Sequence, residues 1–209
     1  KKAGRIPDGG GWRAHGKGSP ETRAAARAGA RGARTGYAYL HSAVDGHTRL
    51  AYTESLENEK ATTAVAFLNR AREWFASHGI TRIERVITDN GACYRSAAFT
   101  AALDGADHRR TRPYTPKHNG KVERYNRTML EEWAYAAAYS CEADRAAQLP
   151  AFLHHYNFHR GHTALRGASP ADRVHNLSAQ HQGVAPVSRH SSRRPCRPQV
   201  PDLPPRARW

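Results

Sequence analysis

The sequence predicts a mixed α/β domain. Its 209 residues suffice for one hydrophobic core with tails. Short β-prone runs alternate along the chain with longer segments whose apolar residues recur at helical spacing. The resulting order is hairpin, helix, strand, helix, strand and long helix, which is typical of a central sheet covered by helices. This pattern alone leaves several α/β folds open.

The N-terminal region combines a short strand with a cationic insertion. Residues 1–6 read as the end of a strand, because the turn sequence Pro7-Asp8-Gly9 follows them. Residues 9–36 are rich in Gly, Ala and Arg and have no sustained period. We therefore expect a mobile basic insertion there.

Regular structure is predicted from Tyr37 onward. The β-prone runs 37–44 and 49–55 are joined by Asp45-Gly46-His47, and Asp-Gly between two such runs signals a hairpin. Residues 60–78 predict an amphipathic helix that stops at Gly79. Its apolar stripe is formed by Ala61, Ala64, Val65, Leu68, Ala71 and Phe75.

The second half of the chain predicts two short strands and three helices. They are a strand at 83–88, a helix at 96–103, an edge strand at 108–112 with an extended linker at 113–116, and helices at 119–138 and 142–159. The buried face of the helix at 119–138 is marked by Val122, Tyr125, Met129, Trp133 and Ala136. Pro150 is the one residue that disfavours the last helix.

Charge and cysteine content narrow the class of partner. With 33 Lys and Arg against 18 Asp and Glu, the formal charge is +15, which favours nucleic acid. A basic, partly disordered protein is the alternative. Cys93, Cys141 and Cys196 are widely spaced, so neither a disulfide framework nor a cysteine zinc site is indicated. No apolar run reaches membrane-spanning length, and we expect a cytoplasmic protein without a membrane partner.

Two carboxylates stand where metal chemistry would need them. Asp89 follows the apolar strand at 83–88, at the strand end where open α/β sheets expose functional groups. Glu123 lies in the first turns of the 119–138 helix, one step off its buried stripe. Such carboxylates suit hard divalent ions such as magnesium. Taken singly, Asp89 is also a turn residue and Glu123 an ordinary surface acid.

Several motifs surround these acids. They are Thr88-Asp89-Asn90-Gly91, Arg112-Pro113-Tyr114-Thr115-Pro116, Asn119-Gly120-Lys121, Glu123-Arg124, Asn126-Arg127-Thr128, Tyr156-Asn157 with Arg160 and His162, Ala164-Leu165 and Ser169-Pro170. Together they resemble the integrase catalytic core (DDE superfamily) of insertion-sequence transposases, which is related to retroviral integrases. The resemblance covers residues 1–180 as one domain. Residues 181–209 are rich in Pro and Arg, and we expect a disordered basic tail.

The resemblance implies an RNase H-like fold with a five-stranded mixed sheet flanked by helices. It also implies metal-dependent cleavage and strand transfer in DNA, by an Asp-Asp-Glu triad with two Mg²⁺ ions for which Mn²⁺ substitutes. Asp89 matches the second acid and Glu123 the third, so the first acid is expected upstream of Lys1. Asp45 is the alternative first acid, although its place in the hairpin favours a turn role. The chain as given is thus expected to be catalytically incomplete.

The resemblance further implies transposon ends and target DNA as partners, a homo-oligomer on DNA, and action at a bacterial nucleoid. DNA contacts are expected from Asn119, Lys121, Arg124 and Arg127. The three cations among them would bind phosphates, and such contacts position the DNA without reading its base sequence. Two alternatives are a non-catalytic DNA-binding fragment of a degenerate mobile element and an RNase H-like nuclease that cuts without joining. His155 and His159 are spaced like the two histidines of a helical zinc site, but the position after His155 is not the Glu that a zinc protease needs.

Overall fold

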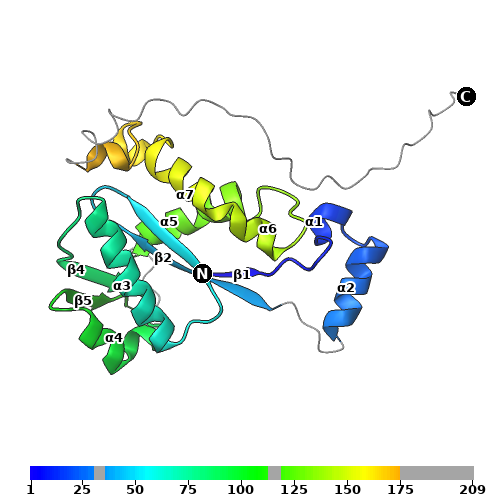
Figure 1. Cartoon of the computed structure of the whole chain (residues 1–209), viewed down its shortest axis with the longest axis horizontal. Helices are drawn as coiled ribbons and strands as arrows, with labels where there is room; N and C mark the ends of the chain where they lie inside the picture. The colour runs from blue at the N-terminus through cyan, green and yellow to red at the C-terminus, as the bar shows by residue number, and fades with distance from the viewer. Residues whose placement is uncertain (31–35, 113–118, 175–209) are drawn as a thin grey trace, which may run out of the picture.

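The computed structural model describes residues 1–30, 36–112 and 119–174 (Figure 1). The linker expected at 113–116 and the tail expected at 181–209 lie outside these ranges. In the described ranges, strands β1, β2 and β3 form an antiparallel sheet in that order, and β4 and β5 pair in parallel. Their bounds are Lys2–Gly4, Tyr37–Val44, Ala51–Leu56, Arg85–Thr88 and Asp107–Arg110.

The predicted α/β class is confirmed, but the sheet differs from the expected one in one respect. The five described strands are hydrogen-bonded as groups of three and two, where a single five-stranded sheet was expected. The physical reason is the short first strand. β1 pairs with Tyr37–Tyr39 only, so it does not extend along the second half of β2 and does not reach β4.

The hairpin of β2 and β3 is closed by the side chain of Asp45. Its Oδ2 accepts hydrogen bonds from the backbone N–H of His47 at 3.1 Å, and from the N–H and hydroxyl of Thr48 at 2.6 and 2.7 Å. Arg49 completes the turn in the left-handed region, with φ 69°. The turn role predicted for Asp45 is therefore confirmed.

Helix α3 (Ala61–Ser77) covers one face of the strands, as its stripe predicts. Ala64, Phe67, Leu68, Ala71 and Phe75 are buried on it. The helix predicted at 96–103 and the strand predicted at 108–112 are also confirmed. Helix α4 (Ala97–Ala102) begins at Ser96, whose hydroxyl accepts from the Phe99 N–H at 3.1 Å, and strand β5 follows it.

The long helix is shorter than predicted. Helix α5 (Gly120–Met129) continues as a π-helical segment, Leu130–Ala134, and then ends. Tyr125, Met129 and Trp133 are buried as expected, but Ala136 is exposed beyond the helix end. The hydroxyl of Tyr139 donates to the Trp133 carbonyl at 2.6 Å, and that carbonyl also accepts from the Ala136 N–H at 3.2 Å, so both bonds fasten the end of the helix.

The helix expected at 142–159 is two helices. They are α6 (Glu142–Ala147) and α7 (Leu149–Phe158), and the break falls at Gln148. Pro150 lies in the first turn of α7, where its missing N–H costs no helical hydrogen bond. Pro150, which would disfavour the interior of one long helix, therefore lies at the start of a second helix.

The insertion at 9–36, expected to be mobile and basic, has helical structure that the sequence pattern did not indicate. It contains α1 (Trp12–His15) and α2 (Pro20–Ala30). Alanine has the highest helix propensity and shows no hydrophobic period, so the pattern concealed the helix. Pro20 opens α2, and the Ser19 hydroxyl accepts from the Thr22 N–H at 3.1 Å.

Helix α7 is fixed to the outer edge of β3. The side-chain amide of Asn157 accepts from the Ala51 N–H at 2.9 Å and donates to the Ala51 carbonyl at 2.8 Å. Tyr156 packs edge-on against Tyr125 of α5, and Arg160 forms an ion pair with Glu132. Through these contacts the Tyr156-Asn157 motif holds α7 against the core. None of the helices within the described ranges is long and apolar enough to cross a membrane.

Candidate functional site

Asp89 lies in the loop directly after β4, as predicted. Its side chain is exposed, and its Oδ1 accepts from the Gly91 N–H at 2.8 Å. The loop is held at both sides: the Thr88 hydroxyl contacts His108 Nε2 at 2.9 Å, and the Asn90 amide donates to the Thr111 carbonyl at 2.6 Å. The carboxylate is therefore presented on a short, well-fastened loop, with its second oxygen accessible.

Neutral side chains flank the Asp89 loop. Burial raises the pKa of the Tyr94 phenol well above its usual range, and the nearby Asp89 carboxylate adds to that shift. Burial also raises the pKa of the Cys93 thiol, with Asp89 again contributing. Both groups stay protonated at neutral pH, so neither is an activated nucleophile, and Asp89 carries the negative charge of this loop.

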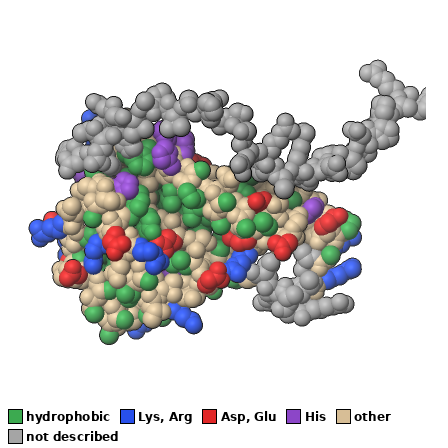
Figure 2. Space-filling view, in the orientation of Figure 1, with side chains coloured by type: hydrophobic (Ala, Val, Ile, Leu, Met, Phe, Trp, Pro, Cys, Tyr) green, Lys and Arg blue, Asp and Glu red, His purple; other side chains and the backbone are tan. Residues whose placement is uncertain are grey.

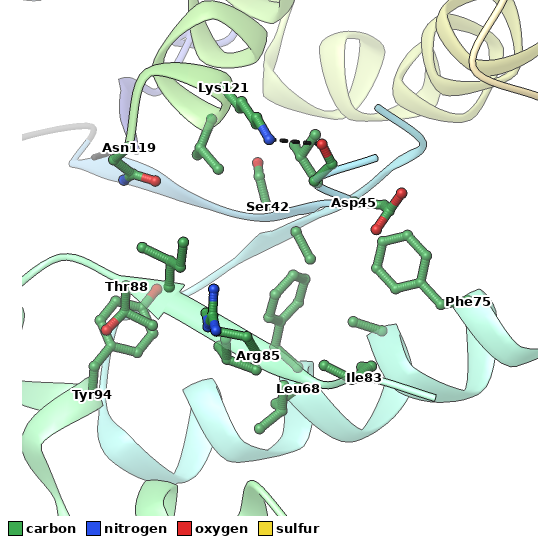
Figure 3. A pocket seen from close by; sticks show the side chains of 18 of the residues that line it. Ser42, Asp45, Leu68, Phe75, Ile83, Arg85, Thr88, Tyr94, Asn119 and Lys121 are labelled. Atoms are coloured by element: carbon green, nitrogen blue, oxygen red, sulfur yellow. Dashed lines mark hydrogen bonds between the residues drawn. The ribbon is translucent and has the colours of Figure 1, made fainter. Parts of the chain in front are cut away.

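A cavity of about 610 Å³ adjoins Asp89 (Figure 3). It lies between β2 on one side and β4 with α3 on the other, and the start of α5 closes one end. Asp45, Asn119 and Lys121 also line it. The Lys121 ammonium donates to the Gly46 carbonyl at 2.7 Å, which ties α5 to the hairpin turn. The cavity thus brings together the predicted second acid Asp89, the alternative first acid Asp45 and two predicted DNA contacts.

Glu123 is not among the residues that line this cavity. It is exposed in the first turn of α5, beside the face formed by Asn119, Val122 and Asn126, which do line it. Glu123 follows Asn119 by four residues and precedes Asn126 by three, so it lies at the edge of the same helix face. Within the described ranges, no three His, Cys, Asp or Glu side chains are grouped closely enough to hold a metal ion.

The predicted DNA contacts divide between cavity and surface. Asn119 and Lys121 face the cavity, whereas Arg124 and Arg127 are exposed on α5. Histidine side chains gather elsewhere, over α7 (Figure 2), where the rings of His154 and His159 are 4.9 Å apart.

The cavity itself was not predicted from the sequence. Ser42 and Ile87 line it, and neither was a candidate site residue. One signal was available: Val86 and Ile87 are consecutive apolar residues, which is typical of a strand buried on both faces and paired on both edges.

Comparisons with known proteins agree with this architecture. Two family models, both described as "Integrase core domain", match residues 23–116 and 104–170. A retrovirus-related Pol polyprotein from the transposon TNT 1-94 of Nicotiana tabacum is 42% identical over 53 residues. That match covers 24% of this chain and only 4% of the polyprotein.

Solved retroviral structures share the fold. The catalytic core domain of BIV integrase superposes with a TM-score of 0.50 at 23% identity, covering 68% of this chain and 88% of that chain. A simian T-cell lymphotropic virus intasome gives 0.54 at 21% identity, covering 77% of this chain and 53% of that chain. The HTLV-2 integrase catalytic core domain, solved with magnesium in a trimeric form, gives 0.50 at 16%, covering 66% and 86%.

At these identities the superpositions establish the fold, which is RNase H-like as the motifs imply. The two family models together extend over residues 23–170 and include both Asp89 and Glu123. The family that the chain resembles is therefore the one whose models are described as "Integrase core domain".

Proposed function

We propose that this chain is the catalytic core of a DNA transposase or integrase, which cleaves phosphodiester bonds and joins DNA strands with divalent metal ions. The observation that carries the proposal is the position of Asp89. In a chain with an integrase core, its carboxylate ends β4 beside a cavity that Asn119 and Lys121 of α5 also line.

The donor chemistry suits Mg²⁺ or Mn²⁺, since Asp89 and Glu123 offer hard carboxylate oxygens. The described residues alone do not complete a metal-holding group, because no three such side chains are grouped among them. We therefore propose a third carboxylate, carried on a segment that precedes Lys1, with Asp45 as the alternative. Two ions held by such a triad would activate the attacking oxygen and stabilise the leaving oxygen.

The chain's own cations would position the DNA. Arg124 and Arg127 are exposed on the same helix as Glu123, and Lys121 reaches the cavity from its first turn. Phosphates bound along α5 would therefore be held beside the carboxylates. Such contacts orient the backbone and carry no sequence information.

A non-catalytic DNA-binding fragment and an RNase H-like nuclease are the competing functions. The first is favoured by the lack of a three-carboxylate group in the described ranges. Supplying a pre-cut DNA end with a free 3′-hydroxyl separates the three functions: a strand-transfer enzyme yields joined product, a nuclease yields only cut product, and a binding fragment yields neither.

Duplex DNA binding is expected to be strongly salt-dependent. If Lys121, Arg124 and Arg127 each neutralise one phosphate, counterion release predicts a roughly 40-fold loss of affinity from 50 to 200 mM salt. Removing both exposed arginines, as Arg124→Ala with Arg127→Ala, should reduce the slope of log affinity against log salt by about 1.8. Titration of a labelled duplex by fluorescence anisotropy measures both quantities.

The matched control is Arg27→Ala, an exposed arginine on α2, which lies at the opposite end of the molecule from β4 (Figure 1). Its salt slope should equal that of the parent chain. An affinity that does not change between the two salt concentrations would exclude phosphate contacts as the basis of binding.

Divalent metal is expected to stabilise the fold through Glu123. A ligand present at ten times its Kd adds about 1.4 kcal/mol, which corresponds to roughly 3 to 6 °C in Tm for a domain of this size. In Glu123→Gln the rise should disappear, because an amide is a weak ligand for Mg²⁺. Thermal unfolding with and without MgCl₂ measures the effect.

The matched control is Glu131→Gln, an exposed acid further along the same helical stretch. This variant should keep the full response to metal. If Glu123→Gln responds as strongly as Glu131→Gln, Glu123 is not a ligand and the proposed triad is wrong.

A further inference from the structure

Another hollow lies at the end of the molecule that carries α1 and α2, away from β4 and α4 (Figure 1). Its volume is about 350 Å³. Residues 136–138, which follow the π-helical segment, line one side, and the other side is lined by residues in and just after α1: Trp12, Arg13, Gly16 and Lys17. We call this hollow the Trp12 slot. It shares no lining residue with the larger cavity of Figure 3, so the proposed metal site does not account for it.

The two sides of the Trp12 slot pack closely against each other at its base. Gly10 has φ 92°, and a Cβ at this position would lie 2.7 Å from the Ala14 Cβ and 3.3 Å from the Tyr139 carbonyl oxygen. Glycine alone adopts this conformation without strain and leaves room for the contact. Any side chain at Gly10 would therefore displace α1 from the backbone near Tyr139.

The chain that leads into α1 is also anchored to α6. The Ile6 N–H donates to Glu142 Oε2 at 3.1 Å, and the buried guanidinium of Arg145 donates to both oxygens of the same carboxylate at 2.9 and 2.7 Å. The Trp133 indole N–H donates to the Arg145 carbonyl at 2.9 Å. Both sides of the slot are thus attached to the same part of the core, so the slot is a preformed feature of the fold.

Aromatic rings hold two cations at the slot. The Arg13 guanidinium carbon lies 4.7 Å from the centre of the Trp12 ring and 5.2 Å from that of the Tyr135 ring. The Lys17 ammonium nitrogen lies 5.2 Å from the centre of the Trp12 ring. Neither cation forms a salt bridge within the described part of the chain. Ring contacts position these charges without neutralising them, so the slot favours an anionic ligand.

The interior of the slot suits a flat ring with polar edges. Trp12 is 47% exposed in spite of the two cations, so much of its indole is open to a ligand. The facing side chains of residues 136–138 are all alanine, small and exposed. The backbone N–H and carbonyl groups of Ala137 and Ala138 form no hydrogen bond with other described residues and are free to pair with a ligand. An open indole and free peptide groups beside two cations match a nucleotide, which has a planar base and a phosphate.

We propose that the Trp12 slot binds one nucleotide of an unpaired DNA strand, with the base against the Trp12 indole and the phosphate beside Arg13 and Lys17. An unpaired strand fits better than a duplex, because the bases of a duplex are already stacked and paired. Residues 9–30 carry four Lys and Arg against one acid, Glu21, so the neighbouring phosphates of a strand would also be attracted. The proposal rests on the proposed function only for the choice of DNA, and it adds a site separate from the carboxylates and from α5.

The first test measures binding of a labelled oligothymidylate to the full chain by fluorescence anisotropy. Trp12→Ala should weaken this binding about tenfold, as expected for the loss of one base stacked on an aromatic ring. Trp12→Phe should retain most of the affinity, because it keeps an aromatic face. The matched control is Tyr37→Ala, at another exposed aromatic residue, which should bind the strand as the parent chain does. Binding of a duplex should be the same in Trp12→Ala and in the parent chain.

The second test concerns the cations and the placement of α1. Arg13→Ala with Lys17→Ala should lower the slope of log affinity against log salt for the single strand by about 1.4. Arg27→Ala, an exposed arginine of α2 that does not line the slot, should leave this slope unchanged. Gly10→Ala keeps every charge and the indole, yet it should weaken binding because it displaces α1. Circular dichroism checks that each variant is folded.

An abasic strand of equal length separates a base contact from simple attraction between charges. The parent chain should bind it about tenfold more weakly than the oligothymidylate, and Trp12→Ala should bind the two strands equally. Equal affinity of the parent chain for both strands would overturn the proposal, and so would equal losses in Trp12→Ala and Tyr37→Ala. Duplex binding through Arg124 and Arg127 and the joining of DNA ends are separate measurements, so failure here leaves the proposed function standing.

Discussion

Adding a strand before Lys1 that carries aspartate as its second residue from Lys1 is expected to raise DNA strand transfer roughly 100-fold or more. The register places this aspartate opposite Ser42. Directly opposed residues of an antiparallel pair project from the same face of the sheet. Ser42 projects toward α5, because the Thr53 hydroxyl contacts both the Ser42 hydroxyl at 2.9 Å and the Tyr125 hydroxyl at 2.6 Å.

An acid at that position would complete the proposed triad. It would lie on the face covered by α5, in the cavity that Asp89 borders, and Glu123 occupies the edge of the same helix face. The chain without it should show activity near background, because at least one metal ion would lack a ligand and the attacking oxygen would not be held in line.

Joined product from a DNA end with a free 3′-hydroxyl, measured at equal folded concentration, checks this prediction. The matched control moves the aspartate by one residue, to the third before Lys1, which turns it to the opposite face of the sheet. That control and the corresponding asparagine variant should both stay near background.

Asp45→Asn in the extended chain separates the two candidates for the first acid. It should lower stability through the hairpin turn, whose three donors are bound by Oδ2, and leave joining intact. If the chain without the extension already joins DNA and Asp45→Asn silences it, then Asp45 is the first acid and the upstream assignment is wrong.

Local signals predicted much of the fold. Asp45-Gly46 marked the hairpin, and the apolar stripe of α3 gave its buried face nearly residue by residue. The same reasoning placed Asp89 at the end of β4, because a short apolar run followed by a turn sequence is a local pattern. Tyr125, Met129 and Trp133 are buried as the period of α5 indicated.

Features that depend on distant contacts were not predictable in this way. The end of the long helix at Ala134 coincides with the bond from the Tyr139 hydroxyl to Trp133, which no periodicity reveals. Helix α2 is a separate case, because it has no large apolar residue to mark a stripe and its local signals were the helix propensity of alanine and the start at Ser19-Pro20. The cavity between β2 and β4 exists because these two strands are not paired with each other. A hydrophobic pattern indicates strands but does not indicate which strand edges are paired.

Asn157→Ala is expected to destabilise the fold by about 3 kcal/mol. The Asn157 side chain is 1% exposed and satisfies both backbone groups of Ala51, which is itself fully buried. Alanine would leave a donor and an acceptor of β3 without partners in the core, and each such group costs about 1 to 3 kcal/mol. The corresponding fall in Tm is roughly 6 to 12 °C.

Urea unfolding followed by circular dichroism measures this loss, with Asn126→Ala as the matched control. Asn126 is an asparagine of α5 whose buried Oδ1 has no hydrogen-bond partner in the structure. Truncating this side chain therefore breaks no hydrogen bond made by Oδ1. The control should lose about 1 kcal/mol or less. Equal losses in the two variants would show that the amide bonds to Ala51 contribute no more than ordinary packing. A larger loss in Asn157→Ala than in Asn126→Ala would show that the Asn157 side chain attaches α7 to the edge of β3.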